Sequence, residues 1–292
     1  MTNANSPTIV VVGSLHYDIM VDAPDRPRKG ETVTGYSWHP KFGGKGGNQA
    51  IAAARAGANV RMAGAVGDDD FGRFLLKELA AAGVDASQVE RLPNAGSGMS
   101  VAISDAGGDY GAVIVSGANL LRDAAALDCP DLWQGARVLI LQNEMPEAIN
   151  IAAARAAKAA GATVCVNAAP YRPLSDEFVA LIDVVVVNAI EAEELSGISV
   201  SDLASAAEAA RALSEKFPTV VVTAGGDGVV GQRRGERPVS LSAIPVKLVS
   251  THGAGDVFVG ALATAIASNQ TFEACIRAAN EAAAIHVSTR PA

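Results

Sequence analysis

The feature that most constrains the fold is an alternation of short β-branched runs with longer alanine-rich runs. The short runs are apolar on consecutive residues, as in strands covered on both faces; they lie at residues 9–12, 60–65, 138–141, 163–167, 184–188 and 219–223. The longer runs have the length and composition of helices; they lie at residues 48–57, 71–82, 146–160 and 203–217. The alternation predicts an α/β fold, in which helices cover both faces of a mostly parallel sheet.

Two segments break this rhythm and predict a second, smaller sheet. Residues 20–38 and 98–115 show alternating patterns and turn residues with no helical run between them, as antiparallel strands do. Because the two segments are far apart in the sequence, we expect a small sheet laid over one edge of the core. The predicted organisation is an α/β core of residues 1–14, 42–96 and 117–292 and a discontinuous β lid of residues 15–41 and 97–116.

Composition excludes several classes of protein. The chain is 49% hydrophobic, 18% charged and 4% aromatic, which indicates a folded globular protein with an aliphatic core. A net charge of −8 without a lysine or arginine cluster argues against nucleic acid as a partner. No stretch reaches the ~18 apolar residues that span a bilayer, and the first residues lack the pattern of a signal peptide, so we expect no membrane partner.

The cysteines favour a reducing compartment. Cys129, Cys165 and Cys275 are odd in number and show no C-x-x-C spacing. Neither a disulfide framework nor a zinc site is indicated, and we expect a cytoplasmic protein.

The stretch Gly253-Ala254-Gly255-Asp256 stands at the start of a predicted helix. The first turn of a helix has unpaired N–H groups, and its dipole gives that end about half a positive charge. Glycines let a phosphate approach this backbone closely. Asp256 could then act as a general base that takes a proton from a hydroxyl as it attacks a phosphoryl group. The alternative is that Asp256 only caps the helix.

A second glycine cluster occupies residues 43–47 and leads into Asn48. Its glycines can bend toward a ligand, while Lys45 and Asn48 offer hydrogen-bond donors to hydroxyl groups. The pattern is not a Walker A loop, and a plain turn before a helix is the alternative. Asp18, after the first strand, could accept hydrogen bonds from two sugar hydroxyls, or serve as a surface or cap residue.

Two further strand ends carry polar or glycine-rich residues. Asn188 and Glu191 could hold the water shell of Mg²⁺, which retains waters and needs few carboxylates. Acids in a first helical turn can also simply complement the dipole. The stretch T-A-G-G-D-G at residues 223–228 could bring backbone close to a nucleotide or form a plain turn.

Together these stretches resemble the ribokinase family of sugar kinases, in order through nearly the whole chain. The matching motifs are G-S-L-H-Y-D at 13–18, G-E-T-V-T-G at 30–35, G-G-K-G-G-N-Q-A at 43–50, N-A-I-E at 188–191, T-A-G-G-D-G at 223–228 and H-G-A-G-D at 252–256. The resemblance implies a ribokinase-like three-layer sandwich with a mostly parallel central sheet and a small β-sheet lid. It also implies transfer of the γ-phosphoryl group of ATP to a primary hydroxyl of a sugar, with ribose or a related pentose as the leading candidate.

The resemblance also implies roles for individual residues. Asp256 would be the catalytic base, and the backbone of Gly253, Ala254 and Gly255 the anion hole. Sugar-binding positions are matched by Asp18, Gly44, Lys45, Asn48 and Glu144, with His16 where the family usually has asparagine. Positions around the nucleotide are matched by Asn188, Thr223, Gly225, Gly228 and Asn280, and Glu191 lies in the motif associated with Mg²⁺, which it would hold through water.

Departures from the family pattern bear on specificity and on cations. His16 is bulkier than asparagine, so a different sugar or a nucleoside could fit better. Ser250 replaces an acid that the family often uses for a monovalent cation, and the chain stops at Ala292 where relatives usually continue. We therefore do not expect activation by potassium (K+).

Alternatives to a pentose kinase remain open. Within the enzyme class they are kinases of fructose, 2-keto-3-deoxygluconate or a nucleoside. A catalytically idle sugar-binding protein is the alternative from another class. A dinucleotide-dependent oxidoreductase is disfavoured, because the first strand does not lead into G-x-G-x-x-G.

Apolar residues of the lid predict a dimer. Met99, Val101, Val113 and Val115 alternate along strands, and a small sheet cannot bury both of its faces alone. Because lids pair in this family, the resemblance implies a homodimer formed through the lid.

Overall fold

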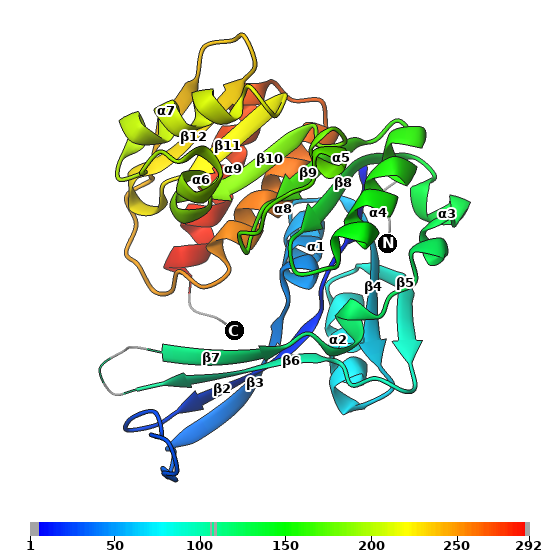
Figure 1. Ribbon diagram of the computed structural model, residues 1–292, viewed down its shortest axis with the longest axis vertical. Helices are drawn as coiled ribbons and strands as arrows, with labels where there is room; N and C mark the ends of the chain where they lie inside the picture. Colours follow the sequence, from blue (N-terminus) through cyan, green and yellow to red (C-terminus); the bar gives the residue numbers. More distant parts are fainter. Residues whose placement is uncertain (1–5, 106, 108–109, 290–292) are drawn as a thin grey trace.

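The protein has a three-layer core and a separate small sheet (Figure 1), as seen in a computed structural model that describes residues 6–105, 107 and 110–289. Within these residues the middle layer is a nine-stranded sheet. From edge to edge its strands are β13 (Val239–Ser242), β12 (Gly228–Arg233), β11 (Thr219–Thr223), β10 (Val184–Asn188), β9 (Thr163–Asn167), β8 (Ala136–Gln142), β1 (Thr8–Val12), β4 (Asn59–Gly67) and β5 (Asp85–Leu92). Neighbours from β11 to β5 are parallel, and β12 and β13 add an antiparallel edge. The predicted α/β fold with a mostly parallel sheet is confirmed.

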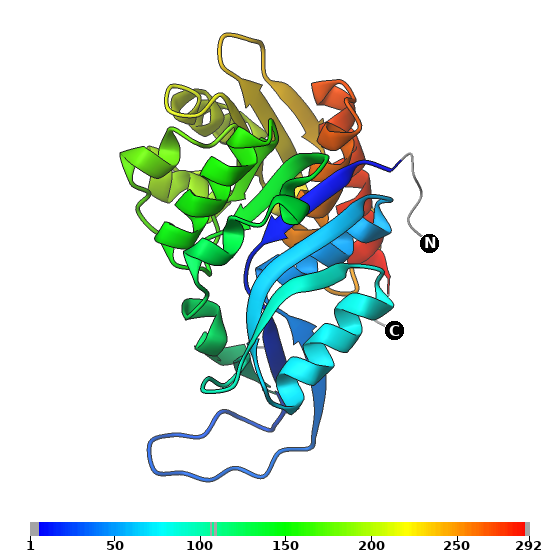
Figure 2. The ribbon, with the colours of Figure 1, turned by 90° about the vertical axis from the view of Figure 1, so that its right-hand side faces the viewer.

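Helices cover both faces of this sheet (Figure 2). One face carries α1 (Lys45–Arg55), α2 (Asp70–Ala81), α8 (Ala254–Ala267) and α9 (Phe272–Ser288). The other carries α3 (Pro130–Trp133), α4 (Glu147–Ala159), α5 (Asp176–Val179), α6 (Ala189–Ser196) and α7 (Leu203–Leu213). Short 3₁₀ turns lie at Gly117–Leu120, Ala124–Leu127 and Gly225–Asp227. No helix in the described part of the chain combines the length and the apolar character needed to cross a membrane.

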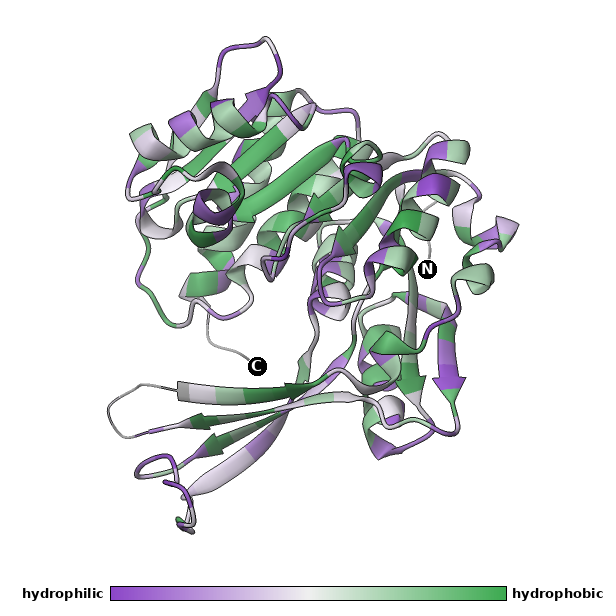
Figure 3. Ribbon diagram, viewed as in Figure 1, coloured by the Kyte–Doolittle hydropathy of each residue, from purple (hydrophilic) through white to green (hydrophobic). Residues whose placement is uncertain are grey.

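Successive residues of a central strand enter different cores. Val10 and Val12 of β1 pack in the layer of α4 and α7, whereas Ile9 and Val11 pack in the layer of α1 and α8. Because neither face meets water, such a strand is apolar at every position. Figure 3 shows this as continuous green along the central strands, in contrast to the mixed colours of the outer helices.

The close packing of α1 against α8 positions the two glycine clusters. A Cβ atom on Gly260 of α8 would lie 2.6 Å from the Ala52 side chain and 2.7 Å from the Ala53 nitrogen. The Thr264 hydroxyl adds a hydrogen bond to the Ala53 carbonyl at 3.4 Å. Since α1 and α8 each begin next to one glycine cluster, this contact brings the two helix starts together.

The second sheet extends away from the core in Figure 1. Its order is β3 (Ser37–Gly43), β2 (His16–Asp22), β6 (Gly98–Ser104) and β7 (Tyr110–Val115). The expected antiparallel pairing holds for β2 with β3 and for β6 with β7, but β2 and β6 are parallel. The reason lies in the core: β2 follows β1 and β6 follows β5, and these parallel strands leave the core at the same edge.

One face of the small sheet is apolar. Met99 pairs with Val115 and Val101 with Val113, so these four side chains share a face, as their alternation predicted. At the base of that face Tyr17 stacks on Phe71 of α2, with ring centroids 4.1 Å apart. On β7, at the edge of this face, Val113 is 68% exposed and Val115 is 51% exposed.

Replacing Gly260 with alanine should lower the melting temperature. Alanine favours a helix by about 1 kcal/mol over glycine, but the added methyl group would overlap the backbone of α1, and overpacking of this kind costs about 1–3 kcal/mol. Thermal unfolding followed by circular dichroism measures the outcome. Gly96→Ala is the matched control, since the nearest atom to its Cβ is an Asp69 carboxylate oxygen at 3.9 Å. Equal melting temperatures for the two variants would contradict this account of the α1–α8 contact.

Candidate active site

The start of α8 presents free backbone N–H groups. Its N-cap, Gly253, has φ 81°, a left-handed conformation that residues with a Cβ atom rarely adopt. The Ala254 amide donates to the Thr251 carbonyl at 3.2 Å. Among the described residues, the amides of Gly253 and Gly255 have no acceptor. Free amides and the helix dipole make this end suitable for an anion, although Ala254, which the resemblance placed in the anion hole, is already engaged.

Asp256 lies in the first turn of α8 and is held by side chains of α1. Its Oδ1 accepts a hydrogen bond from Gln49 Nε2 at 2.9 Å, and its Oδ2 lies 3.4 Å from the Asn48 amide nitrogen. The capping alternative is wrong, because Gly253 is the N-cap and no side chain caps this helix. Burial raises the pKa of Asp256, against the opposing effect of the nearby Lys45 charge. A raised pKa suits a general base.

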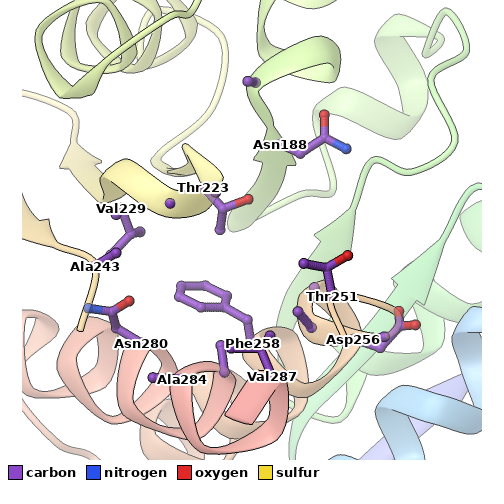
Figure 4. A pocket seen from close by; sticks show the side chains of 18 of the residues that line it. Asn188, Thr223, Val229, Ala243, Thr251, Asp256, Phe258, Asn280, Ala284 and Val287 are labelled. Carbon is purple, nitrogen blue, oxygen red and sulfur yellow. The ribbon is translucent and has the colours of Figure 1, made fainter. Parts of the chain in front are cut away.

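A cavity of about 920 Å³ opens at this helix start. The predicted residues that line it are Lys45, Asn188, Glu191, Thr223, Gly225, Gly228, Gly253, Ala254, Gly255, Asp256 and Asn280. Away from Asp256 the wall is largely apolar, with Val229, Ala243, Phe258, Ala284 and Val287 around its end (Figure 4). The cavity therefore suits a ligand with an anionic end and a flat apolar end.

Asn188 and Glu191 form a capping box at the start of α6. The side-chain oxygen of Asn188 accepts a hydrogen bond from the backbone N–H of Glu191. In return, the Glu191 carboxylate accepts one from the backbone N–H of Asn188, and both are 2.9 Å long. Burial raises the pKa of Glu191, against opposing hydrogen bonds from Asn188 and the charge of Lys45. One Glu191 oxygen thus serves the helix, while the side chain also lines the cavity.

The T-A-G-G-D-G stretch is both a turn and a cavity wall. It contains the 3₁₀ turn between the antiparallel strands β11 and β12, and the Thr223 hydroxyl donates to the Val187 carbonyl at 3.3 Å. Across the cavity, Asn280 of α9 donates to the Ser242 carbonyl at 3.0 Å. The turn and the ligand-binding interpretation are therefore compatible.

Asp18 lies on the small sheet, outside the lining of this cavity. Its Oδ1 accepts a hydrogen bond from the Ser100 hydroxyl at 2.5 Å. Burial raises the pKa of Asp18, and the Ser100 hydrogen bond opposes that shift. A Cβ atom on Gly43 would overlap the Asp18 carboxylate, so the acid packs against the loop that leads into α1.

Glu144 and Gly44 meet beneath this loop. Glu144 Oε2 accepts from the Lys45 amide at 2.9 Å and also from the Ser14 hydroxyl. Gly44, with φ 85°, makes the turn from β3 into α1 and packs on the backbone of residues 14–16. Glu144 is close enough for its charge to act on Asp256. The ends of β1 and β8 and the start of α1 are thereby joined.

His16 is buried at the base of the small sheet. It is 4% exposed, and its Nε2 has no hydrogen-bond partner among the residues that the structure describes. A Cβ atom on Gly98 would lie 2.5 Å from its ring, and His16 does not line the large cavity. Contact between His16 and a sugar stays a prediction.

Several residues of the site were not predicted from the sequence. Gln49 stands in the second glycine motif, beside Asn48, and that adjacency is the signal that could have found it. Ser14 and Ser100 depend on which strands meet, which no local pattern reports. Phe258 lies two residues after Asp256 and lines the cavity, but in the sequence it stands in an apolar run that is also typical of a buried helix.

A comparison with models of protein families assigns the chain to a family. The model of the pfkB family of carbohydrate kinases matches residues 6–292. The chain belongs to this family. The predicted membership is thus confirmed, and the protein is a sugar kinase.

Several ribokinases align with nearly the whole length of this chain. It is 34% identical to the ribokinase of Haemophilus influenzae over 287 residues, which are 98% of this chain and 94% of that protein. It is 35% identical to the ribokinase of Bacillus subtilis over 281 residues, covering 96% and 92% of the two chains. The solved structure of Arabidopsis thaliana ribokinase complexed with ribose and ATP matches with a TM-score of 0.91 and 31% identity, covering 98% and 94%.

Asp256→Asn should raise the melting temperature at neutral pH. Because the pKa of Asp256 is raised above its ordinary value of 3.8, the folded state binds this proton more readily than the unfolded state. Stability is then lost as the pH rises from about 3.8 through the raised pKa. Replacing the carboxylate with a neutral amide should therefore raise the melting temperature at about pH 7. It should change the melting temperature little near pH 3, where the carboxyl group is protonated in both the folded and the unfolded state.

Thermal unfolding at both pH values measures this difference. Asp128→Asn, at an exposed position with no hydrogen bond or ion pair from its carboxylate among the described residues, is the control and should change little. A lower melting temperature for Asp256→Asn at neutral pH would show that the carboxylate stabilises the fold.

Proposed function

We propose that this kinase transfers the γ-phosphoryl group of ATP to a primary hydroxyl of a sugar, with ribose or a related pentose as the acceptor. The observation that carries the proposal is the Asp256 carboxylate, 8% exposed and bound by two amide side chains at the free N–H groups of α8. The similar ribokinases, one of them complexed with ribose and ATP, support the choice of substrates.

In the proposed reaction Asp256 accepts the proton of the attacking hydroxyl. The amides of Gly253 and Gly255 would stabilise negative charge that develops on the transferred group. Phosphoryl transfer needs positioning and charge stabilisation more than covalent help from the protein. The contacts of Asn48 and Gln49 hold the base in place before substrate arrives.

The sugar would lie between Asp256 and the base of the small sheet. Asp18 and Glu144 would accept hydrogen bonds from its hydroxyl groups, and Lys45 and Asn48 would donate. The hydrogen bond from Asn48 to Asp256 and that from the Lys45 amide to Glu144 link these groups. His16 and Gly44 belong to the same proposed sugar site.

The cavity would hold the nucleotide. Asn188, Thr223, Gly225, Gly228 and Asn280 would surround it. The apolar end around Phe258 suits a purine ring, and the glycines of the β11–β12 turn allow close approach of backbone to a ligand.

The donor set fits a magnesium ion held through water. Glu191 lines the cavity but has one oxygen engaged by the Asn188 amide, and no group of three or more His, Cys, Asp or Glu side chains in the described residues could hold a metal. Mg²⁺ keeps several waters and binds one or two carboxylates plus substrate phosphates. When bound, it would neutralise charge on the phosphates. We propose no role for K+, because Ser250 offers only a neutral hydroxyl.

We propose that segments 15–41 and 97–116 act as a lid over the sugar and that two copies pair through it. The support is the exposed apolar face around Val113 and Val115. We also propose a cytoplasmic location, which the three free cysteines support.

Asp256→Asn should lower kcat by about 100-fold or more, the scale of general-base contributions, while ATP binding is largely retained. ADP release measured with ATP, Mg²⁺ and a panel of ribose, fructose, 2-keto-3-deoxygluconate and nucleosides tests both the base and the acceptor. Asp128→Asn is the control. Near-normal turnover by Asp256→Asn would remove this residue from the mechanism, and sugar binding without turnover in the unaltered protein would favour an idle binding protein.

Val113→Lys should convert a lid-mediated dimer into monomers, because a charge would be buried in the apolar interface. Sedimentation velocity at equal protein concentrations reports the change. The control is Ile285→Lys. Ile285 is also an exposed aliphatic residue, but it lies on α9, so this substitution should leave the dimer intact. A monomeric unaltered protein, or a dimer that persists in Val113→Lys, would exclude this interface.

A further inference from the structure

The residues before α8 form a tight turn that leads into its free amides. Gly253 has φ 81° and ψ 1°, and the Ala254 amide donates to the Thr251 carbonyl at 3.2 Å. These are the dihedral angles of the third residue, and the closing hydrogen bond, of a type II β-turn over residues 251–254. The central peptide of this turn joins His252 to Gly253, so its N–H is the Gly253 amide that the proposed reaction uses.

The orientation of that central peptide decides where the Gly253 N–H points. In a planar trans peptide, the C=O and N–H groups point in opposite directions. A type I turn differs from a type II turn by a flip of the central peptide, and glycine tolerates the dihedral angles of both. Because Gly253 itself permits either orientation, a contact from outside the turn is needed to hold one of them.

His286 of α9 supplies such a contact. Its Nε2 lies 2.9 Å from the carbonyl oxygen of His252. Because a carbonyl oxygen only accepts hydrogen bonds, Nε2 carries a proton and donates it. Among the described residues no other group donates to this carbonyl, and α8 leaves it unused. His286 thus binds the side of the central peptide that is opposite the Gly253 N–H.

Further contacts fix the end of α9 against the same loop. The backbone amides of Val249 and Ser250 donate to the Val287 carbonyl at 2.8 and 3.3 Å. A Cβ atom on Gly253 would lie 3.5 Å from His286 Nε2, so the imidazole ring contacts the turn itself. Val287 also lines the cavity that opens at the start of α8 (Figure 4). The His286 hydrogen bond is therefore part of a larger contact between α9 and the loop.

We infer that His286 is a positioning residue for phosphoryl transfer, which keeps the Gly253 N–H directed at the transferred group. The inference rests on the proposed function and adds to its anion hole a side chain that does not itself line the cavity. A donor on the carbonyl oxygen fixes the plane of the peptide and also polarises the N–H of the same peptide, since linked hydrogen bonds strengthen one another. Donors that are held in place before the reaction stabilise the charge that develops in the transition state.

A comparison of His286→Gln with His286→Met tests the donor. The two new side chains have similar lengths, and the amide nitrogen of glutamine can take the position of Nε2, whereas methionine has no donor. We expect His286→Met to lower the single-turnover rate of phosphoryl transfer by about tenfold, the scale of one hydrogen bond, and His286→Gln to keep most of that rate. His286→Ala, a second variant without a donor, should lose as much as His286→Met. The matched control is Ile285→Met, at the neighbouring exposed position on α9, and it should change the rate little.

Binding of a transition-state mimic separates positioning from a structural role. ADP with aluminium fluoride, Mg²⁺ and the sugar imitates the phosphoryl group during transfer, whereas ADP alone lacks that group. Calorimetry should show that His286→Met weakens binding of the fluoride complex by about tenfold and leaves the affinity for ADP alone unchanged. An unchanged transfer rate in His286→Met, equal losses in His286→Met and His286→Gln, or an equal loss of affinity for ADP alone would each overturn the inference.

Failure of this inference is distinguishable from failure of the proposed function. Phosphoryl transfer by the unaltered protein at a rate that His286→Met does not change leaves the ATP-dependent kinase intact and removes only the role of His286. Absence of ADP release from the unaltered protein with every sugar of the panel overturns the proposed function and this inference with it.

Discussion

The contact between α1 and α8 is the constraint on which the site depends. Gly260 has no side chain, so α8 can approach the backbone of Ala52 and Ala53 more closely than any other residue would allow. That approach places Asn48 and Gln49 within hydrogen-bonding distance of Asp256. A buried carboxylate without such donors would be strongly destabilising, so the packing of two helices decides whether the base can exist in its charged form.

The parallel sheet explains why residues from distant segments meet. The carboxyl ends of parallel strands lie at one edge, and ligands bind in such folds where the strand order reverses. Here β1 lies between β8 and β4, so chain segments leave it in opposite directions. Ser14 follows β1, Glu144 follows β8 and Asn188 ends β10, which brings a hydroxyl and two polar side chains to the same edge.

Buried acids show where function opposes stability. Burial raises the pKa of Asp18, Glu191 and Asp256, which means that the charged form of each carboxylate costs folding free energy. Clusters of perturbed acids are typical of functional sites. Each acid accepts a hydrogen bond: Asp18 from Ser100, Asp256 from Gln49, and Glu191 from the backbone N–H of Asn188 at the helix N-cap. Lys45 contributes positive charge near Glu191 and Asp256. The arrangement limits the cost while keeping the acids available.

Local sequence patterns determined the class of fold, the two glycine-rich helix starts and the polar strand ends, because periodicity and helix-start chemistry are encoded within a few residues. They did not predict the antiparallel strands β12 and β13 or the parallel pairing of β2 with β6, since these depend on how separate segments align. The helix α9 was also not predicted, although its alanine-rich run and its Thr271 cap are local features. The same limit applies to side-chain partners. Only the tertiary structure decided that Gln49 holds Asp256 and that Ser100 holds Asp18, because strand register and helix packing are properties of the whole chain.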